Sequence, residues 1–318
     1  MKTMTEPTNV LVFLRESTAP YRERLVDSDE ARYLFCESED DIARNIETAD
    51  VILGSIQFPT VHLARARRLR WSQVTGAGVD RFLAKAEIPT GVQLTRADLS
   101  FGEQIAEYVI GHLLAHTQRL RTVYALQEAR RWEPLTAEFL RGRTLGVAGV
   151  GSIGRLVAER ARAFGMRTAG LTRSGGDLAG FDASYGPDQR DAFLSDLDVL
   201  VLCLPLTPET HRWIGRAELA VMKPSALLVN VARGAIVDEA ALIDALREKR
   251  IGGAILDVFE TEPLPADSPL WTLADVTVTS HQAGLNVPDE MIDFFLANLA
   301  RFRAGRPLEG LVDPERGY

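Results

Sequence analysis

The sequence contains little cysteine and no long apolar run. Only Cys36 and Cys203 occur among 318 residues, and Cys203, within the apolar run VLVLCLP, is expected to be a buried thiol rather than half of a disulfide. No apolar segment reaches the roughly 20 residues that cross a bilayer. The apolar run near the N-terminus, about five residues long, is too short for the core of a signal peptide. We therefore expect a cytoplasmic protein with no membrane partner.

Basic residues are also scarce relative to acidic ones. The chain has 36 Lys and Arg against 44 Asp and Glu, a net charge of −8, so no general attraction for nucleic acid or anionic lipid is expected. The basic run at 65–70 is short and is better interpreted as a solvated helix end. His112 and His116 lie four residues apart, but no third ligand follows at metal-site spacing, so no metal site is expected.

What the chain does contain is two series of short β-rich runs that alternate with helix-compatible stretches, the pattern of βαβ units and parallel sheets. In the first series we predict strands at 9–15, 32–36, 50–54, 69–74 and 92–97. In the second we predict strands at 144–148, 167–171, 199–204, 226–231, 253–258 and 276–279. Several of these runs are apolar throughout, as expected for strands covered on both faces. Helical periodicity predicts one long helix over 101–132 and another over 289–303.

The second series opens with a G-x-G-x-x-G motif formed by Gly149, Gly151 and Gly154. A strand pattern, TLGVA, runs into these glycines and an amphipathic helix follows them, which is the setting that dinucleotide binding requires. The glycines permit a tight turn, close approach of the pyrophosphate and close helix–strand packing. The helix start, Ser152 and Ile153, is expected to offer N–H groups to the phosphates. A glycine-rich turn without a ligand is the less favoured interpretation.

An acidic residue is expected about 20 residues beyond these glycines, where it would bind the ribose 2′-hydroxyl. This chain has Thr172, Arg173 and Ser174 there instead. An arginine with two hydroxyls can bind a 2′-phosphate, which a carboxylate would repel. Asp177 is a rival for the ribose but lies beyond two further glycines. The sequence thus favours NADP(H), with NAD(H) possible if Arg173 only stacks on adenine.

Four stretches together resemble the D-isomer-specific 2-hydroxyacid dehydrogenases: TLGVAGVGSIGR, CLPLTPET, LLVNVARGAIVDEAALIDAL, and the segment from AILDVFETEPLPADSPLW to VTVTSHQAG. VTGAGVD, at 74–80, resembles the family's substrate loop. The resemblance spans about residues 50–300. It implies an α/β fold of two doubly wound parallel-sheet domains, with a Rossmann nucleotide domain (101–285) inserted in a flavodoxin-like substrate domain (1–100 plus 286–318). It also implies a homodimer with the long helix near the interface.

Three residues that follow predicted strands match the family's catalytic positions. Arg233 offers a planar fork for a carboxylate or oxyanion, His281 can deliver a proton near neutral pH, and Glu262 can hydrogen-bond His281 and stabilise its cationic form. Because the carboxyl ends of parallel strands meet at one sheet edge, the three side chains can converge. Each alone has an ordinary structural interpretation, namely a turn cap, a loop histidine and an exposed acid; together they predict a site.

Further positions are carried over from the resemblance alone. Asp257 is expected near the nicotinamide carboxamide, although an Asp that caps a turn is the alternative. The backbone N–H groups of Ala77 and Gly78 are expected to hold the substrate carboxylate. The remaining positions are expected to line the cofactor groove: Leu204, Pro205, Thr210, Val231, Ala232 and Gly284.

The prediction is therefore an NADPH-preferring oxidoreductase that reduces small 2-oxo acids, such as glyoxylate or hydroxypyruvate, to D-2-hydroxy acids. A phosphoglycerate dehydrogenase-like enzyme using NAD is the runner-up, and no extra basic cluster for a substrate phosphate is evident. A corepressor-like, nucleotide-sensing binding protein is the alternative of another class, since the same fold serves such proteins. A formate dehydrogenase is the least favoured.

Overall fold

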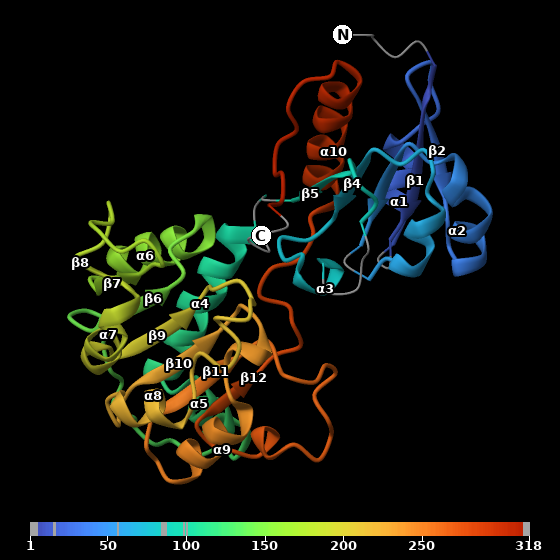
Figure 1. Ribbon diagram of the computed structural model, residues 1–318. Coiled ribbons are helices and arrows are strands. Elements are labelled where there is room, and N and C mark those ends of the chain that lie inside the picture. Colours follow the sequence, from blue (N-terminus) through green and yellow to red (C-terminus); the bar gives the residue numbers. More distant parts are fainter. Residues whose placement is uncertain are drawn as a thin grey trace. The chain divides into compact units, whose positions relative to one another are not determined.

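The computed structural model describes residues 6–14, 17–55, 57–83, 88–97, 99 and 101–313. The chain forms two compact units, shown in Figure 1. The first comprises Met1–Phe101 and Asn286–Tyr318, and the second comprises Gly102–Leu285, so that in chain order the second unit interrupts the first. The assignment of one unit to the substrate and the other to the dinucleotide stays a prediction.

The first unit contains a parallel sheet in the order β2-β1-β3-β4-β5, the flavodoxin-like order 2-1-3-4-5. Its strands are β1 (Thr8–Phe13), β2 (Ala31–Phe35), β3 (Val51–Gly54), β4 (Trp71–Val74) and β5 (Gln93–Arg96). The described helices are α1 (Ala19–Arg24), α2 (Glu39–Asn45), α3 (Asp80–Leu83) and α10 (Pro288–Arg303). All five strands and the C-terminal helix lie within two residues of their predicted bounds.

Alternating side chains of this sheet bury both of its faces. Leu11 of β1 belongs to the buried cluster that contains Ile42 of α2. On the other face, Trp71 of β4 stacks on Phe295 of α10 with ring centroids 5.2 Å apart. Because successive side chains of a strand point to opposite faces, apolar runs rather than strict alternation suit this two-sided cover.

The second unit contains a parallel sheet in the order β12-β11-β10-β9-β6-β7-β8. Numbered within the unit, this is the doubly wound order 3-2-1-4-5-6 with one added strand. The strands are β6 (Thr144–Ala148), β7 (Arg167–Leu171), β8 (Ala183–Tyr185), β9 (Val199–Leu202), β10 (Leu227–Asn230), β11 (Gly253–Leu256) and β12 (Val276–Val278). The predicted class, two parallel α/β sheets, is confirmed; β8 was not predicted.

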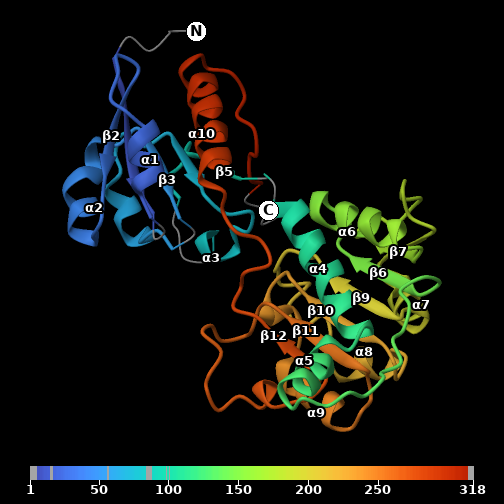
Figure 2. The same cartoon turned by 180° about the vertical axis from the view of Figure 1, so that it is seen from behind.

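The prediction of a single helix over 101–132 is wrong. The structure has α4 (Phe101–Thr117) and α5 (Leu120–Glu128), separated at Arg119, whose φ of 54° is left-handed. Figure 2 shows α4 in front of the sheet of its unit. The other helices of this unit are α6 (Ser152–Ala163), α7 (Arg190–Asp196), α8 (Arg216–Val221) and α9 (Glu239–Arg247). None of the helices in the described ranges is both long and apolar enough to cross a bilayer.

Candidate active site

The glycine motif forms a turn in which two of the three positions accommodate only glycine. Gly149 follows β6 with a φ of 96°, and a Cβ atom there would lie 2.6 Å from the carbonyl oxygen of Cys203. A Cβ on Gly154 would lie 2.3 Å from the carbonyl oxygen of Gly149. A side chain at either position would displace backbone, so the turn requires glycine for conformation and for packing.

The third glycine faces open space. Nothing in the described parts of the chain lies within 4 Å of a Cβ placed on Gly151, which is the N-cap of α6. The first turn of α6 carries no acidic residue, so the helix dipole there is not offset by a carboxylate. The space, the N–H groups at the helix start and the absence of acid in that turn fit a pyrophosphate.

A buried polar group without a hydrogen-bond partner among the described residues follows the end of β7. The Thr172 hydroxyl is buried and makes no hydrogen bond to any residue that the structure describes, a costly condition that a bound ligand would relieve. Arg173 and Ser174 are exposed beside it. The positive charge of Arg173 contributes to lowering the pKa of Glu209, after the stronger effect of the Thr207 hydroxyl. This edge therefore combines a cation with an unsatisfied hydroxyl.

Hydrogen bonds between residues of the loop after β9 hold its shape. Thr210 donates its hydroxyl to the carbonyl of Pro205 at 2.6 Å and accepts the N–H of Thr207 at 2.8 Å. These bonds give Thr210 a role in shaping the loop, which begins with the Cys203–Leu204 backbone against Gly149. Cys203 is a free, half-buried cysteine, and burial raises the pKa of its thiol to about 12. It is therefore not a nucleophile near neutral pH.

The backbone of Val231, Ala232 and Arg233 is held by Asn230, a buried residue at the end of β10. The Asn230 amide donates to the carbonyl of Arg233 at 3.0 Å and accepts the N–H of Ala232 at 3.1 Å. Sequence reasoning missed Asn230, although a polar residue that ends the apolar run LLVN was a usable signal. The half-buried Arg233 side chain donates to the carbonyl of Ala232 at 2.7 Å.

The side chains of Glu262 and His281 form a hydrogen-bonded pair in the loops that follow β11 and β12. His281 Nδ1 lies 3.0 Å from Glu262 Oε2, while Glu262 Oε1 accepts the N–H of Phe259 at 3.2 Å. The Glu262 side chain is 16% exposed and that of His281 is 38% exposed. With Nδ1 facing a carboxylate, Nε2 is the ring nitrogen that can exchange a proton with another molecule. Arg233, Glu262 and His281 follow the adjacent strands β10, β11 and β12, as predicted from their positions in the sequence.

Asp257 organises the turn that presents His281. Its buried carboxylate accepts the Thr279 hydroxyl at 2.6 Å and the N–H groups of Gln282 and Ala283, each at 2.9 Å. Its carbonyl accepts the His281 N–H at 2.8 Å. The alternative foreseen for Asp257, an acid that caps a turn, describes these contacts. The segment continues through the half-buried Gly284 to Leu285, whose N–H binds Gln104 at 2.8 Å.

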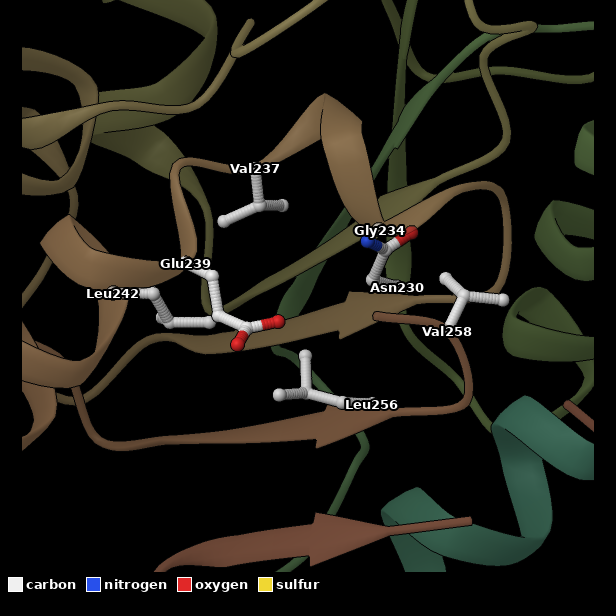
Figure 3. Close-up of a pocket in the computed structure, with 7 residues that line it drawn as sticks. All are labelled: Asn230, Gly234, Val237, Glu239, Leu242, Leu256 and Val258. Carbon is white, nitrogen blue, oxygen red and sulfur yellow. The ribbon is translucent and has the colours of Figure 1, made fainter. Parts of the chain in front are cut away.

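A small cavity lies beneath the Arg233 loop and is shown in Figure 3. It is lined by Asn230, Gly234, Val237, Glu239, Leu242, Leu256 and Val258, and the Glu239 carboxylate points into it. Burial raises the pKa of Glu239, and the charge of Glu260 adds to that effect. The space is about that of one water molecule, so it cannot hold a substrate.

Two further expected residues belong to the first unit, and no metal site was expected at the histidines of α4. Ala77 and Gly78 belong to the first unit, in the loop after β4, where Arg96 donates to the carbonyl of Ala77 at 3.1 Å. His112 of α4 packs on the Tyr108 ring, with centroids 4.3 Å apart, and burial lowers its pKa. No group of three or more metal-ligating side chains occurs in the part of the chain that is described.

The fold and the site define an NAD(P)-dependent 2-hydroxyacid dehydrogenase. The chain belongs to the D-isomer-specific 2-hydroxyacid dehydrogenase family, whose NAD-binding domain pattern matches residues 110–283. It is 35% identical over 266 residues to glyoxylate/hydroxypyruvate reductase A of Serratia proteamaculans. The aligned segment covers 82% of this chain and 85% of the relative.

Solved structures agree with this placement. A D-isomer-specific 2-hydroxyacid dehydrogenase family protein of Aeromonas salmonicida superposes with a TM-score of 0.90 at 36% identity, over 97% of this chain and 100% of the other. The NADPH-dependent glyoxylate/hydroxypyruvate reductase of Sinorhizobium meliloti, in complex with NADP and sulfate, gives a TM-score of 0.87 at 30% identity, over 98% and 100% of the two chains. The predicted family and enzyme class are confirmed.

Proposed function

We propose that this enzyme reduces small 2-oxo acids, glyoxylate and hydroxypyruvate among them, to D-2-hydroxy acids with a preference for NADPH. The observation that carries the proposal is the His281–Glu262 pair, 3.0 Å from Nδ1 to Oε2, at the sheet edge that also presents Arg233. Relatives named glyoxylate/hydroxypyruvate reductase support the choice of substrates.

His281 is the proton donor in this proposal. Glu262 stabilises the imidazolium and orients the ring through Nδ1, so that Nε2 faces the substrate carbonyl oxygen as it gains negative charge. The planar guanidinium of Arg233 binds the carboxylate and the carbonyl oxygen of the substrate in this proposal. Ala77 and Gly78 remain predicted contacts to the substrate carboxylate. The bound nicotinamide would supply the hydride.

Cofactor binding is proposed at the glycine turn and the end of β7. Gly149, Gly151 and Gly154 with the start of α6 would hold the pyrophosphate, and Thr172, Arg173 and Ser174 would bind the 2′-phosphate. The buried Thr172 hydroxyl, which bonds to none of the described residues, supports the phosphate assignment. The loops of Leu204, Pro205, Val231, Ala232, Asp257 and Gly284 would line the rest of the groove.

A homodimer in the cytoplasm completes the proposal. Its support is the apolar surface beyond α4: α5 has no buried residue, and Trp132, Phe139 and Tyr124 are 100%, 75% and 58% exposed. Aromatic side chains gathered on one segment are typical of a surface that another chain covers. Sedimentation of the purified enzyme tests this: a Trp132→Ser, Phe139→Ser variant is expected to dissociate at concentrations where the wild type is dimeric.

A panel of 2-oxo acids assayed with NADPH and with NADH tests the proposed activity. Glyoxylate and hydroxypyruvate with NADPH are expected to give the highest kcat/KM. Phosphorylated oxo acids and bulky ones, including those with branched side chains, are expected to have a kcat/KM at least tenfold lower. Failure to oxidise NADPH with any of these acids, in a protein that binds NADPH, would refute the proposal.

A further inference from the structure

Helix α4 reaches the turn of His281 through a chain of short hydrogen bonds. The hydroxyl of Tyr108, on α4, lies 2.6 Å from the hydroxyl of Thr279, which lies 2.6 Å from Asp257 Oδ1. Thr279 is the residue after the last one of β12, and Asp257 is the residue after the last one of β11. Three separate elements therefore meet in one hydrogen-bonded row.

The chemistry of the three groups fixes the direction of these bonds. The Asp257 carboxylate also accepts the N–H groups of Gln282 and Ala283, so it acts as an acceptor throughout. The Thr279 hydroxyl has one hydrogen, and it points to Asp257. Tyr108 must then donate to Thr279. A hydroxyl that both accepts and donates is polarised, which strengthens each bond in the row.

The row ends on a strained piece of backbone. His281 has a φ of 54°, in the left-handed region that non-glycine residues seldom occupy. Its neighbours Gln282 and Ala283 are bound by the Asp257 carboxylate, and its own N–H is bound by the Asp257 carbonyl. Such a conformation persists only where its surroundings hold it. The orientation of the His281 ring toward Glu262 thus depends on how Asp257 is held.

We propose that Tyr108 and Thr279 are positioning residues for His281: they fix the Asp257 carboxylate, which fixes the turn that aims the imidazole. The inference rests on the proposed role of His281 as proton donor. Tyr108 does not contact the reacting atoms in this account and acts through Thr279 and Asp257 alone.

The surroundings keep the Tyr108 phenol protonated near neutral pH. Burial, with the nearby charge of Asp257, raises the pKa of Tyr108 to about 12, so the phenol remains a donor. His112, which packs on the Tyr108 ring, is half-buried, and burial lowers its pKa, so the imidazole beside the phenol stays neutral near pH 7.

Four single variants and one double variant of the full-length enzyme test the proposal. Tyr108→Phe and Thr279→Val remove one hydroxyl each at nearly constant volume, and Thr279→Ser keeps the hydroxyl. Tyr33→Phe, on β2 of the other unit, is the matched control. For each variant we would measure kcat and KM for glyoxylate, the Kd of NADPH, and backbone hydrogen exchange of residues 280–284.

Tyr108→Phe and Thr279→Val are expected to lower kcat about tenfold, to leave KM and Kd within about twofold, and to speed exchange of residues 280–284 about tenfold. The Tyr108→Phe, Thr279→Val double variant is expected to be no slower than Thr279→Val, because both changes break one row. Thr279→Ser and Tyr33→Phe are expected to match the wild type.

Wild-type kcat and exchange in both Tyr108→Phe and Thr279→Val would overturn the inference, as would losses that multiply in the double variant. A wild-type enzyme that turns over none of the oxo acids would instead refute the proposed function. In that case the exchange measurement still decides whether the row holds the turn of His281.

Discussion

Gly234 lies so close to Phe259 that a Cβ atom on the glycine would be 1.9 Å from the Phe259 carbonyl carbon. Phe259 also donates its N–H to Glu262 Oε1 at 3.2 Å. The contact therefore joins the loop that carries Arg233 to the loop that carries Glu262, and glycine alone permits it. This one approach of backbone to backbone joins the loops, after β10 and β11, that carry two of the proposed catalytic side chains.

Replacing this glycine should damage stability and turnover together. Gly234→Ala forces the Phe259 backbone to move, so the free energy of unfolding is expected to fall by about 1–3 kcal/mol and kcat to fall with it. Gly111→Ala is the matched control, since a Cβ there meets nothing within 4 Å in the described chain. Because Gly111 lies in the exposed middle of α4, the Gly111→Ala substitution should raise the free energy of unfolding by up to about 1 kcal/mol. Urea unfolding measures both; a Gly234→Ala protein as stable as the wild type would contradict the account.

Arg233 is expected to matter for its shape as well as its charge. Arg233→Ala should reduce kcat/KM for glyoxylate about 10²–10³-fold, as loss of a preorganised oxyanion or carboxylate donor does. Arg233→Lys should recover less than about a tenth of the wild-type value, because an ammonium group lacks the planar fork. NADPH affinity, measured by fluorescence, should stay within about twofold in both. Near-normal turnover of the lysine variant would show that charge alone suffices.

Arg173 should discriminate between the two cofactors. Arg173→Ala is expected to lower kcat/KM with NADPH about 10–100-fold, the worth of a charged hydrogen bond to phosphate, and to change kcat/KM with NADH about twofold or less. Arg216→Ala, which removes an exposed arginine paired with Asp244 on α9, is the control. The prediction is refuted if the wild type uses NADH and NADPH equally well, or if Arg173→Ala affects both alike.

The strands could be predicted because each is a short apolar run between polar segments, and both sheets bury two faces. β8 escaped prediction because Ala183–Tyr185 is short and only half-buried, so its sequence carries no apolar run. The break at Arg119 escaped because it contains neither Gly nor Pro. A left-handed arginine is a product of packing that propensity does not reveal.

The contact between His281 and Glu262 could be anticipated because both residues follow adjacent strands whose ends share one sheet edge, and because both match positions of the family. The residues that hold the two loops were missed, although the polar end of the apolar run LLVN was a usable signal for Asn230. Asn230 acts through side-chain hydrogen bonds to the backbone of the Arg233 loop, and Gly234 acts through its close approach to the Phe259 backbone. Tyr108 lies some 170 positions from Thr279 in the chain. Pairing over such separations depends on tertiary packing, which a single sequence does not specify.

The central claim is that His281, oriented by Glu262, delivers the proton. The measurement that tests it most directly is kcat for glyoxylate reduction in His281→Ala, beside the Kd of NADPH for the same protein. In His281→Ala we expect kcat to fall by at least about 10²-fold and the Kd to stay within about twofold of wild type, with a smaller loss of kcat in Glu262→Gln. A His281→Ala enzyme that binds NADPH and retains wild-type kcat would contradict it.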